Sequence, residues 1–96
     1  MSKTSTPYDF ALTCQFAKGL TDGSVSRETA TLLPSGHYAK AADDRIAAYA
    51  EQKDLDVPQA TARLFQRRDP VLMQLRDAQQ QAEVREARAQ LGRDAL

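Results

Sequence analysis

The sequence predicts an α+β domain, in which an N-terminal β-hairpin packs on three α-helices and the last helix is long. Three observations lead to this fold class. Apolar side chains alternate from Tyr8 to Phe16, which is the period of a strand. The pair Asp22-Gly23 suits the two-residue turn that closes a hairpin. After a break at residues 34–36, the remaining sequence has helical periodicity and helix start signals.

The size and charge of the chain limit what it can be. Its 96 residues allow one domain, 1–96, with residues 1–7 as a flexible N-terminus. A hydrophobic fraction of 42% and a charged fraction of 27% are those of a chain that folds. Thirteen basic and thirteen acidic residues cancel, so the whole molecule has no field that attracts nucleic acid or an anionic membrane.

The hairpin is predicted over residues 8–33. Folding about the turn would pair Leu12 with Leu33 and create one apolar face, which must be covered by helices to persist. The alternative is an all-α fold with a helical N-terminus. In that reading Thr6 caps a helix, Pro7 is its first residue, and Leu12 pairs with Phe16 one turn later. The sequence leaves open whether residues 8–20 are strand or helix.

A helix pair is predicted over residues 38–68. The first helix, 38–53, places four small or aromatic residues on the same face as Ile46, namely Ala39, Ala42, Tyr49 and Ala50. The second helix is capped by Asp56 and has Pro58 in its first turn, where a missing N–H costs little. Its expected buried arc consists of Val57, Ala60, Thr61, Leu64 and Phe65.

A third helix is predicted over residues 70–91. Asp69 supplies the cap and Pro70 the first helical residue, and no glycine or proline interrupts the chain before Gly92. Its main apolar stripe is rich in leucine at the start and consists of alanine later: Val71, Leu72, Leu75, Ala78, Ala82 and Ala89. We therefore expect the second half of this helix to bury little against its own domain.

The third helix also carries a thinner apolar stripe on its opposite side, formed by Met73, Val84, Ala87 and Leu91. A helix with two apolar faces needs two partners, and this chain is too small to cover both. The stripe therefore predicts a non-catalytic protein–protein contact with an unidentified partner. A homodimer through the C-terminal helix is a further expectation. The residues expected to support the fold or such a dimer are Val71, Leu75, Ala78 and Ala82.

A basic cluster suggests nucleic-acid binding as the less favoured alternative. The two predicted helices of the pair resemble a helix-turn-helix, whose second helix would present side chains to a major groove. The candidate residues are Gln59, Arg63, Arg67 and Arg68. Against this reading, the turn lacks the usual glycine and the net charge is zero.

Catalysis is not expected. Cys14 and His37 are the single conceivable thiol pair, and Cys14 falls on the apolar face of the predicted strand. One cysteine and one histidine cannot form a zinc site, and no phosphate-binding glycine loop occurs, so no metal and no cofactor are expected. The sequence has no signal-peptide core and no apolar run of membrane length, which predicts a cytoplasmic protein.

The segment 45–80 resembles the scaffold-like helical tails of tailed-phage head-assembly proteins. The residues that carry this likeness are the helix Arg45-Ile46-Ala47-Ala48-Tyr49-Ala50, the turn and helix at Val57-Pro58-Gln59-Ala60, and the helix start at Arg68-Asp69-Pro70-Val71-Leu72. The resemblance covers less than half of the chain. It implies a phage or mobile-element accessory protein that acts in assembly, and it carries over no catalytic residue. A small phage-encoded inhibitor of a host protein, such as an anti-defence factor, is the alternative of the same kind.

Overall fold

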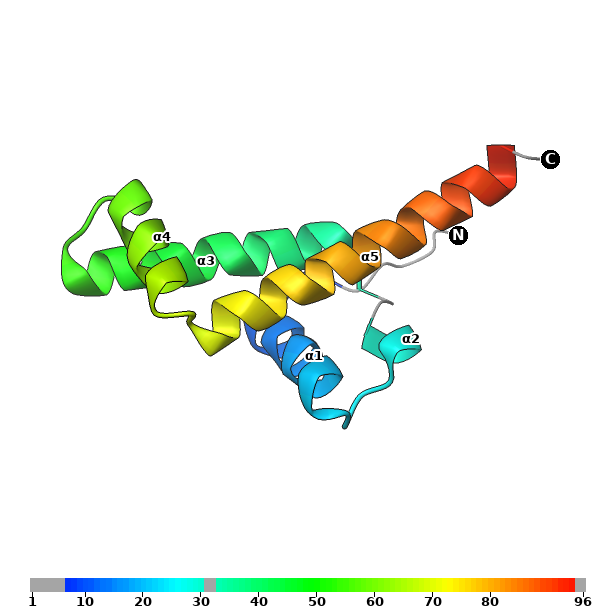
Figure 1. The fold of residues 1–96 in the computed structure, drawn as a ribbon, viewed down its shortest axis with the longest axis horizontal. Coiled ribbons are helices and arrows are strands. Elements are labelled where there is room, and N and C mark those ends of the chain that lie inside the picture. Colours follow the sequence, from blue (N-terminus) through cyan, green and yellow to red (C-terminus); the bar gives the residue numbers. More distant parts are fainter. Residues whose placement is uncertain (1–6, 31–32, 95–96) are drawn as a thin grey trace.

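The computed structural model describes residues 7–30 and 33–94 and contains helices joined by short turns. The helices α3 and α5 lie side by side, α1 packs against both of them, and α4 lies at the far end of α3 (Figure 1). The molecule is elongated, with extents of 50 × 28 × 26 Å. The elements in chain order are α1 (Phe10–Asp22), α2 (Arg27–Ala30), α3 (Ser35–Lys53), α4 (Val57–Gln66) and α5 (Pro70–Asp94).

The predicted N-terminal hairpin is wrong, because residues 7–30 and 33–94 contain no β-strand. The all-α alternative with a helical N-terminus is confirmed, and α1 occupies the first arm of the expected hairpin. Its cap is Asp9, whose Oδ1 accepts a hydrogen bond from Leu12 N at 2.9 Å. The cap considered before, Thr6, lies outside the described residues, as does the rest of segment 1–6 of the expected flexible N-terminus.

The Asp22-Gly23 pair ends a helix instead of closing a hairpin. Gly23 has φ 82° and ψ 3°, which is the left-handed conformation, and it forms the C-cap of α1. A type I′ turn requires residues with positive φ, and a glycine with positive φ is also a common way to end a helix, so the dipeptide does not distinguish between them. The expected second arm contains the short helix α2 and the buried Leu33, while residues 31–32 lie outside the described part.

The buried face of α1 consists of small residues. The alternation of large apolar side chains along this segment therefore does not mark its buried face, and it wrongly indicated a strand. Thr13, Ala17 and Gly19 are buried, whereas Phe16 is half-buried and Phe10 is exposed. Thr13 can be buried because its Oγ1 donates to the carbonyl oxygen of Asp9 at 2.7 Å. Small side chains on this face allow α1 to lie close against α5.

The helix pair forms much as the sequence predicts. α3 begins three residues earlier than expected, at Ser35, and ends at Lys53, as predicted; its C-cap is Asp54, which has φ 56°. The predicted cap of α4 is confirmed, since Asp56 accepts from Gln59 N at 2.9 Å and Pro58 lies in the first turn. The expected arc of α4 is only partly buried: Ala60 and Leu64 are buried, whereas Val57 and Phe65 are 56% and 37% exposed.

The last helix divides into a packed half and an exposed half. It begins at Pro70, as predicted, and extends to Asp94. Its buried residues face α1 and α3 and belong to the main predicted stripe: Leu72, Leu75, Ala78 and Ala82. Every side chain over residues 83–92 is exposed, and this includes Ala89 of the same stripe. The expectation that the second half buries little is confirmed.

Candidate functional site

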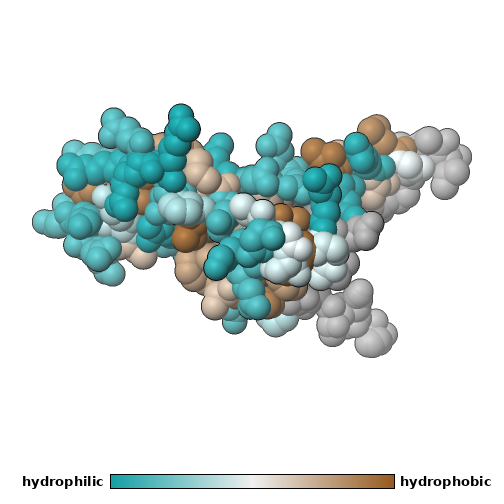
Figure 2. Space-filling model, turned by 60° about the horizontal axis from the view of Figure 1, so that its bottom comes forward, coloured by the Kyte–Doolittle hydropathy of each residue, from teal (hydrophilic) through white to brown (hydrophobic). Residues whose placement is uncertain are grey.

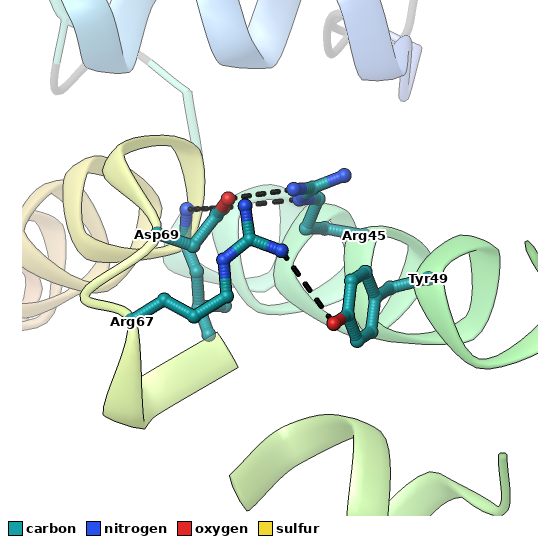
Figure 3. Close-up of polar contacts among 5 residues, drawn as sticks. Arg45, Tyr49, Arg67 and Asp69 are labelled. Atoms are coloured by element: carbon teal, nitrogen blue, oxygen red, sulfur yellow. Dashed lines mark hydrogen bonds and ion pairs between the residues drawn. The ribbon is translucent and has the colours of Figure 1, made fainter. Parts of the chain in front are cut away.

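An ion pair between the half-buried Arg45 and the buried Asp69 joins the middle of α3 to the beginning of α5 (Figure 3). Arg45 Nε donates to Asp69 Oδ2 at 3.0 Å, and Arg45 Nη2 donates to Asp69 Oδ1 at 2.6 Å. The same carboxylate caps α5 by accepting from Leu72 N at 3.0 Å, and Asp69 is only 4% exposed. The hydrogen bond from Arg45 lowers the pKa of Asp69 below its ordinary value, although burial acts in the opposite direction. Asp69 thus links the start of α5 to the middle of α3.

All four residues of the nucleic-acid alternative are exposed, and one of them also makes a contact within the chain. Gln59 and Arg63 are exposed on α4, and Arg68 is exposed in the turn that follows. Arg67 is exposed as well, and it donates from Nη1 to Tyr49 Oη at 3.5 Å, with its guanidinium 5.6 Å from the centre of the Tyr49 ring (Figure 3). The nucleic-acid alternative therefore stays a prediction, and Arg67 is the one of its four residues for which a contact with Tyr49 is observed.

The thiol considered for catalysis has the properties of a structural side chain. Cys14 is half-buried on α1, and burial raises its pKa above the ordinary value. An activated cysteine needs a lowered pKa, so this environment favours the inactive thiol. His37 lies edge-on to the ring of Tyr8, with ring centres 5.7 Å apart. Over residues 7–30 and 33–94, no three His, Cys, Asp or Glu side chains gather to hold a metal ion.

The predicted partner-binding residues fall into two groups. Met73 is half-buried and packs against the core, whereas Val84, Ala87 and Leu91 lie on the exposed half of α5. Val84 is 46% exposed and Leu91 is 67% exposed. Hydrophobic surface is visible near the right-hand end of the molecule in Figure 2, toward which the C-terminal part of α5 runs. We call Val84, Ala87 and Leu91 the distal stripe.

Glu86 attaches the exposed half of α5 to the first residue of α3. Ser35 N donates to Glu86 Oε2 at 3.0 Å, and Ser35 Oγ donates to Glu86 Oε1 at 2.7 Å. The N-cap of α3 is Pro34, which has no side-chain acceptor, so the carboxylate of another helix takes the place of a local cap. A negative charge at this helix end also interacts favourably with the helix dipole. The sequence gives no sign of this pair, because its members are 51 residues apart.

A groove of about 610 Å³ lies between α2 and the exposed face of α5. Three of its lining residues are basic and one is acidic, and Val84 of the distal stripe belongs to the same lining. The residues are Arg27 from α2 and Asp77, Gln80, Gln81, Val84, Arg85 and Arg88 from α5. Sequence reasoning did not find this groove, because it arises only where α2, which was expected to be a strand, approaches α5.

Comparison of the chain with models of known protein families, with curated proteins and with solved structures finds no match. The resemblance of segment 45–80 to phage scaffold-like tails therefore stays a prediction. None of the helices described here combines the length and the apolar character that crossing a membrane requires.

Proposed function

We propose that this chain is a non-catalytic protein-binding module, and that its contact with the partner is made by the distal stripe. The observation that supports the proposal is that α5 continues as a helix beyond its last buried residue, Ala82, and exposes Val84 and Leu91 there. These residues and Ala87 lie within an arc of about 60° on the helix. Among the described residues, the other exposed large apolar ones, Phe10, Val57 and Phe65, lie on other helices.

The distal stripe can contribute to affinity without a large ordering cost. Complete burial of a valine or leucine side chain is worth about 1.5–3 kcal/mol each, and roughly half of that remains available where a side chain is already half-covered. A helix that is formed before binding also loses little conformational freedom on association. Glu86 holds this part of α5 against Ser35, so the stripe is presented in a fixed position.

The partner determines what the binding accomplishes. The resemblance to phage scaffold-like tails favours an accessory role in assembly, in which the chain holds other proteins together. Inhibition of a host protein is the alternative, and it would use the same surface because the chain then acts by occupying a site on its target. Both roles require a protein contact at α5 and no chemistry by the chain itself.

Site-specific photo-crosslinking in the native cells tests this proposal. A photo-reactive amino acid replaces Leu91 in one variant and Ala87 in a second. The control variant carries it at Ala48, which is exposed on α3 away from the distal stripe. We expect a discrete protein adduct from both α5 positions and none from Ala48.

Each outcome of the crosslinking has a defined meaning. An adduct at twice the chain mass of 10.6 kDa identifies a second copy and supports the homodimer, whereas a heavier adduct identifies a different partner. The proposal fails if the α5 positions give no adduct, or if Ala48 gives the same products with the same yield.

A further inference from the structure

We propose that the α4 end of the molecule binds the sugar-phosphate backbone of double-stranded DNA through Lys53, Arg63 and Arg67. We call these three residues the α4 basic surface. This binding goes beyond the proposed function and does not depend on it, because α4 lies at the opposite end of the molecule from the C-terminal part of α5, which carries the distal stripe (Figure 1).

Positive charge is concentrated around α4 although the whole chain is neutral. Residues 57–68 contain three arginines and no acidic residue, which leaves ten basic against thirteen acidic residues in the rest of the chain. Lys53, Arg63 and Arg67 are exposed, and none of them forms an ion pair within the described ranges. A net charge of zero therefore does not exclude a local attraction for phosphate groups.

The three cations lie close to one another at the junction of α3 and α4. Arg63 and Arg67 are one helical turn apart, and Arg67 Nη1 donates to Tyr49 Oη at 3.5 Å (Figure 3). Lys53 is one turn beyond Tyr49 on α3. The hydrogen bond from Arg67 lowers the pKa of Tyr49 below its ordinary value, against the effect of burial. The positive charges of Lys53 and Arg63 add to this lowering, so both lie near the same hydroxyl group.

The acidic groups near this surface do not neutralise it. The carboxylate of Asp69 is paired with Arg45. Asp56 caps the first turn of α4, and the seven residues that separate it from Arg63 correspond to about 10 Å along the helix axis. The α4 basic surface therefore keeps its positive charge in the folded chain.

The composition of α4 favours a DNA duplex over an acidic protein or a single strand. The residues farthest around the helix from the buried Leu64 are Gln59, Ala62 and Gln66. This face thus has no large apolar side chain, whereas protein interfaces have an apolar core and protein–DNA interfaces are polar and positively charged. Single strands are bound by exposed aromatic rings on which bases stack. The ring of Tyr49 is buried, and Phe65 lies about 160° around α4 from Arg63.

α4 is also placed where a helix can enter a groove of DNA. It lies at the far end of α3, away from α1 and α2 (Figure 1). The major groove of B-DNA admits an α-helix, whereas that of double-stranded RNA is too narrow for side chains to read. The turn before α4 does not need the glycine of a typical helix-turn-helix, because Asp54 itself has a left-handed φ of 56° there.

Fluorescence anisotropy with labelled DNA tests the inference. The probe is a fluorescein-labelled duplex of mixed sequence and about 20 base pairs, which is two turns of B-DNA, and it is titrated with the full chain at low salt. We expect saturable binding, with a slope of about −3 for log affinity against log salt, because three cations displace counterions from the phosphates. Arg63→Glu should weaken binding by about tenfold or more, since it replaces an attraction for phosphate by a repulsion.

The matched control is Arg88→Glu. It makes the same change of charge on the exposed half of α5, where Arg88 forms no ion pair with any residue that the structure describes. We expect it to change the affinity by less than about threefold, because a charge far from the bound DNA is screened. Arg63 and Arg88 are both exposed, so circular dichroism should show unchanged folding in both variants.

Three further probes identify the chemistry that is recognised. A single strand of the same length, an RNA duplex of the same sequence and a peptide of glutamate should each bind more weakly than the DNA duplex. The inference is overturned if the DNA duplex does not bind at low salt, if Arg88→Glu weakens binding as much as Arg63→Glu, or if any of the three other probes binds more tightly than the DNA duplex.

Discussion

At the scale of single residues, Asp69 makes the most consequential contact in the fold. One buried carboxylate accepts two hydrogen bonds from Arg45 and one from the backbone of α5. A buried charge is tolerated only when it is paired and hydrogen-bonded, and both conditions hold here. The sequence predicted Asp69 as a helix cap, but its partner Arg45 is 24 residues away and could not be predicted.

The substitution Asp69→Asn should lower the free energy of unfolding by about 2 kcal/mol at neutral pH. Asparagine is also a good helix cap, so the loss reports mainly on the ion pair. The pKa of Asp69 is lowered in the folded state, which means that its contribution is present above the ordinary pKa and is lost as the pH falls through the folded-state pKa. The difference in the free energy of unfolding between the native chain and Asp69→Asn should therefore become smaller below about pH 4.

Urea unfolding followed by circular dichroism at neutral and acidic pH measures this difference. The control is Asp43→Asn on the exposed face of α3, where we expect a change within about 0.5 kcal/mol. An Asp69→Asn deficit that is the same at both pH values would show that ionisation of the carboxylate is not what stabilises the fold.

At the scale of elements, α1 shows where sequence reasoning succeeds and where it fails. Helices with an acidic cap and a following proline were located to within a few residues, because a cap satisfies orphan backbone groups locally. The α1 segment was misassigned because its buried face consists of Thr13, Ala17 and Gly19, which a search for large apolar side chains overlooks. Whether small residues on a helix are buried depends on the elements that pack against them, and a local sequence pattern carries no information about those elements.

Two glycines on different helices give a test of this packing. A Cβ built on Gly19 would overlap the side chain of Val25, lying 2.7 Å from its Cβ, whereas one built on Gly36 would meet nothing within 4 Å. We expect Gly19→Ala to lower the free energy of unfolding by about 1–3 kcal/mol through overpacking. Gly36→Ala should raise it by about 0.5 kcal/mol, because alanine is the better helix former.

Thermal unfolding of the two glycine variants against the native chain gives the comparison. We expect Gly19→Ala to unfold at a lower temperature than the native chain and Gly36→Ala to unfold at a higher one. If Gly19→Ala were as stable as Gly36→Ala, the turn that brings Val25 back onto α1 would not be packed as described.

At the scale of the whole molecule, α5 packs along part of α3 and against α1, and its C-terminal part then continues past the other helices (Figure 1). Its two apolar faces were predictable from the sequence, because helical periodicity is local. Two other features of the candidate site were not predictable. The contact between Glu86 and Ser35 and the groove containing Arg27 arise only when α2, α3 and α5 come together. The sequence therefore predicted the distal stripe. The structure adds the contact between Glu86 and Ser35, which holds this part of α5, and the groove that lies beside the stripe.

The central claim is that α5 is already a helix beyond Ala82 and offers a preformed surface to a partner. Amide hydrogen exchange of the free protein, resolved by residue, tests this claim most directly. We expect residues 83–88 to exchange more slowly than an unstructured chain. Protection should be lower in Glu86→Gln, because a neutral amide binds the N-terminus of α3 less strongly and so holds this part of α5 less firmly. Exchange over residues 83–88 at the rate of an unstructured peptide in the native chain would contradict the claim.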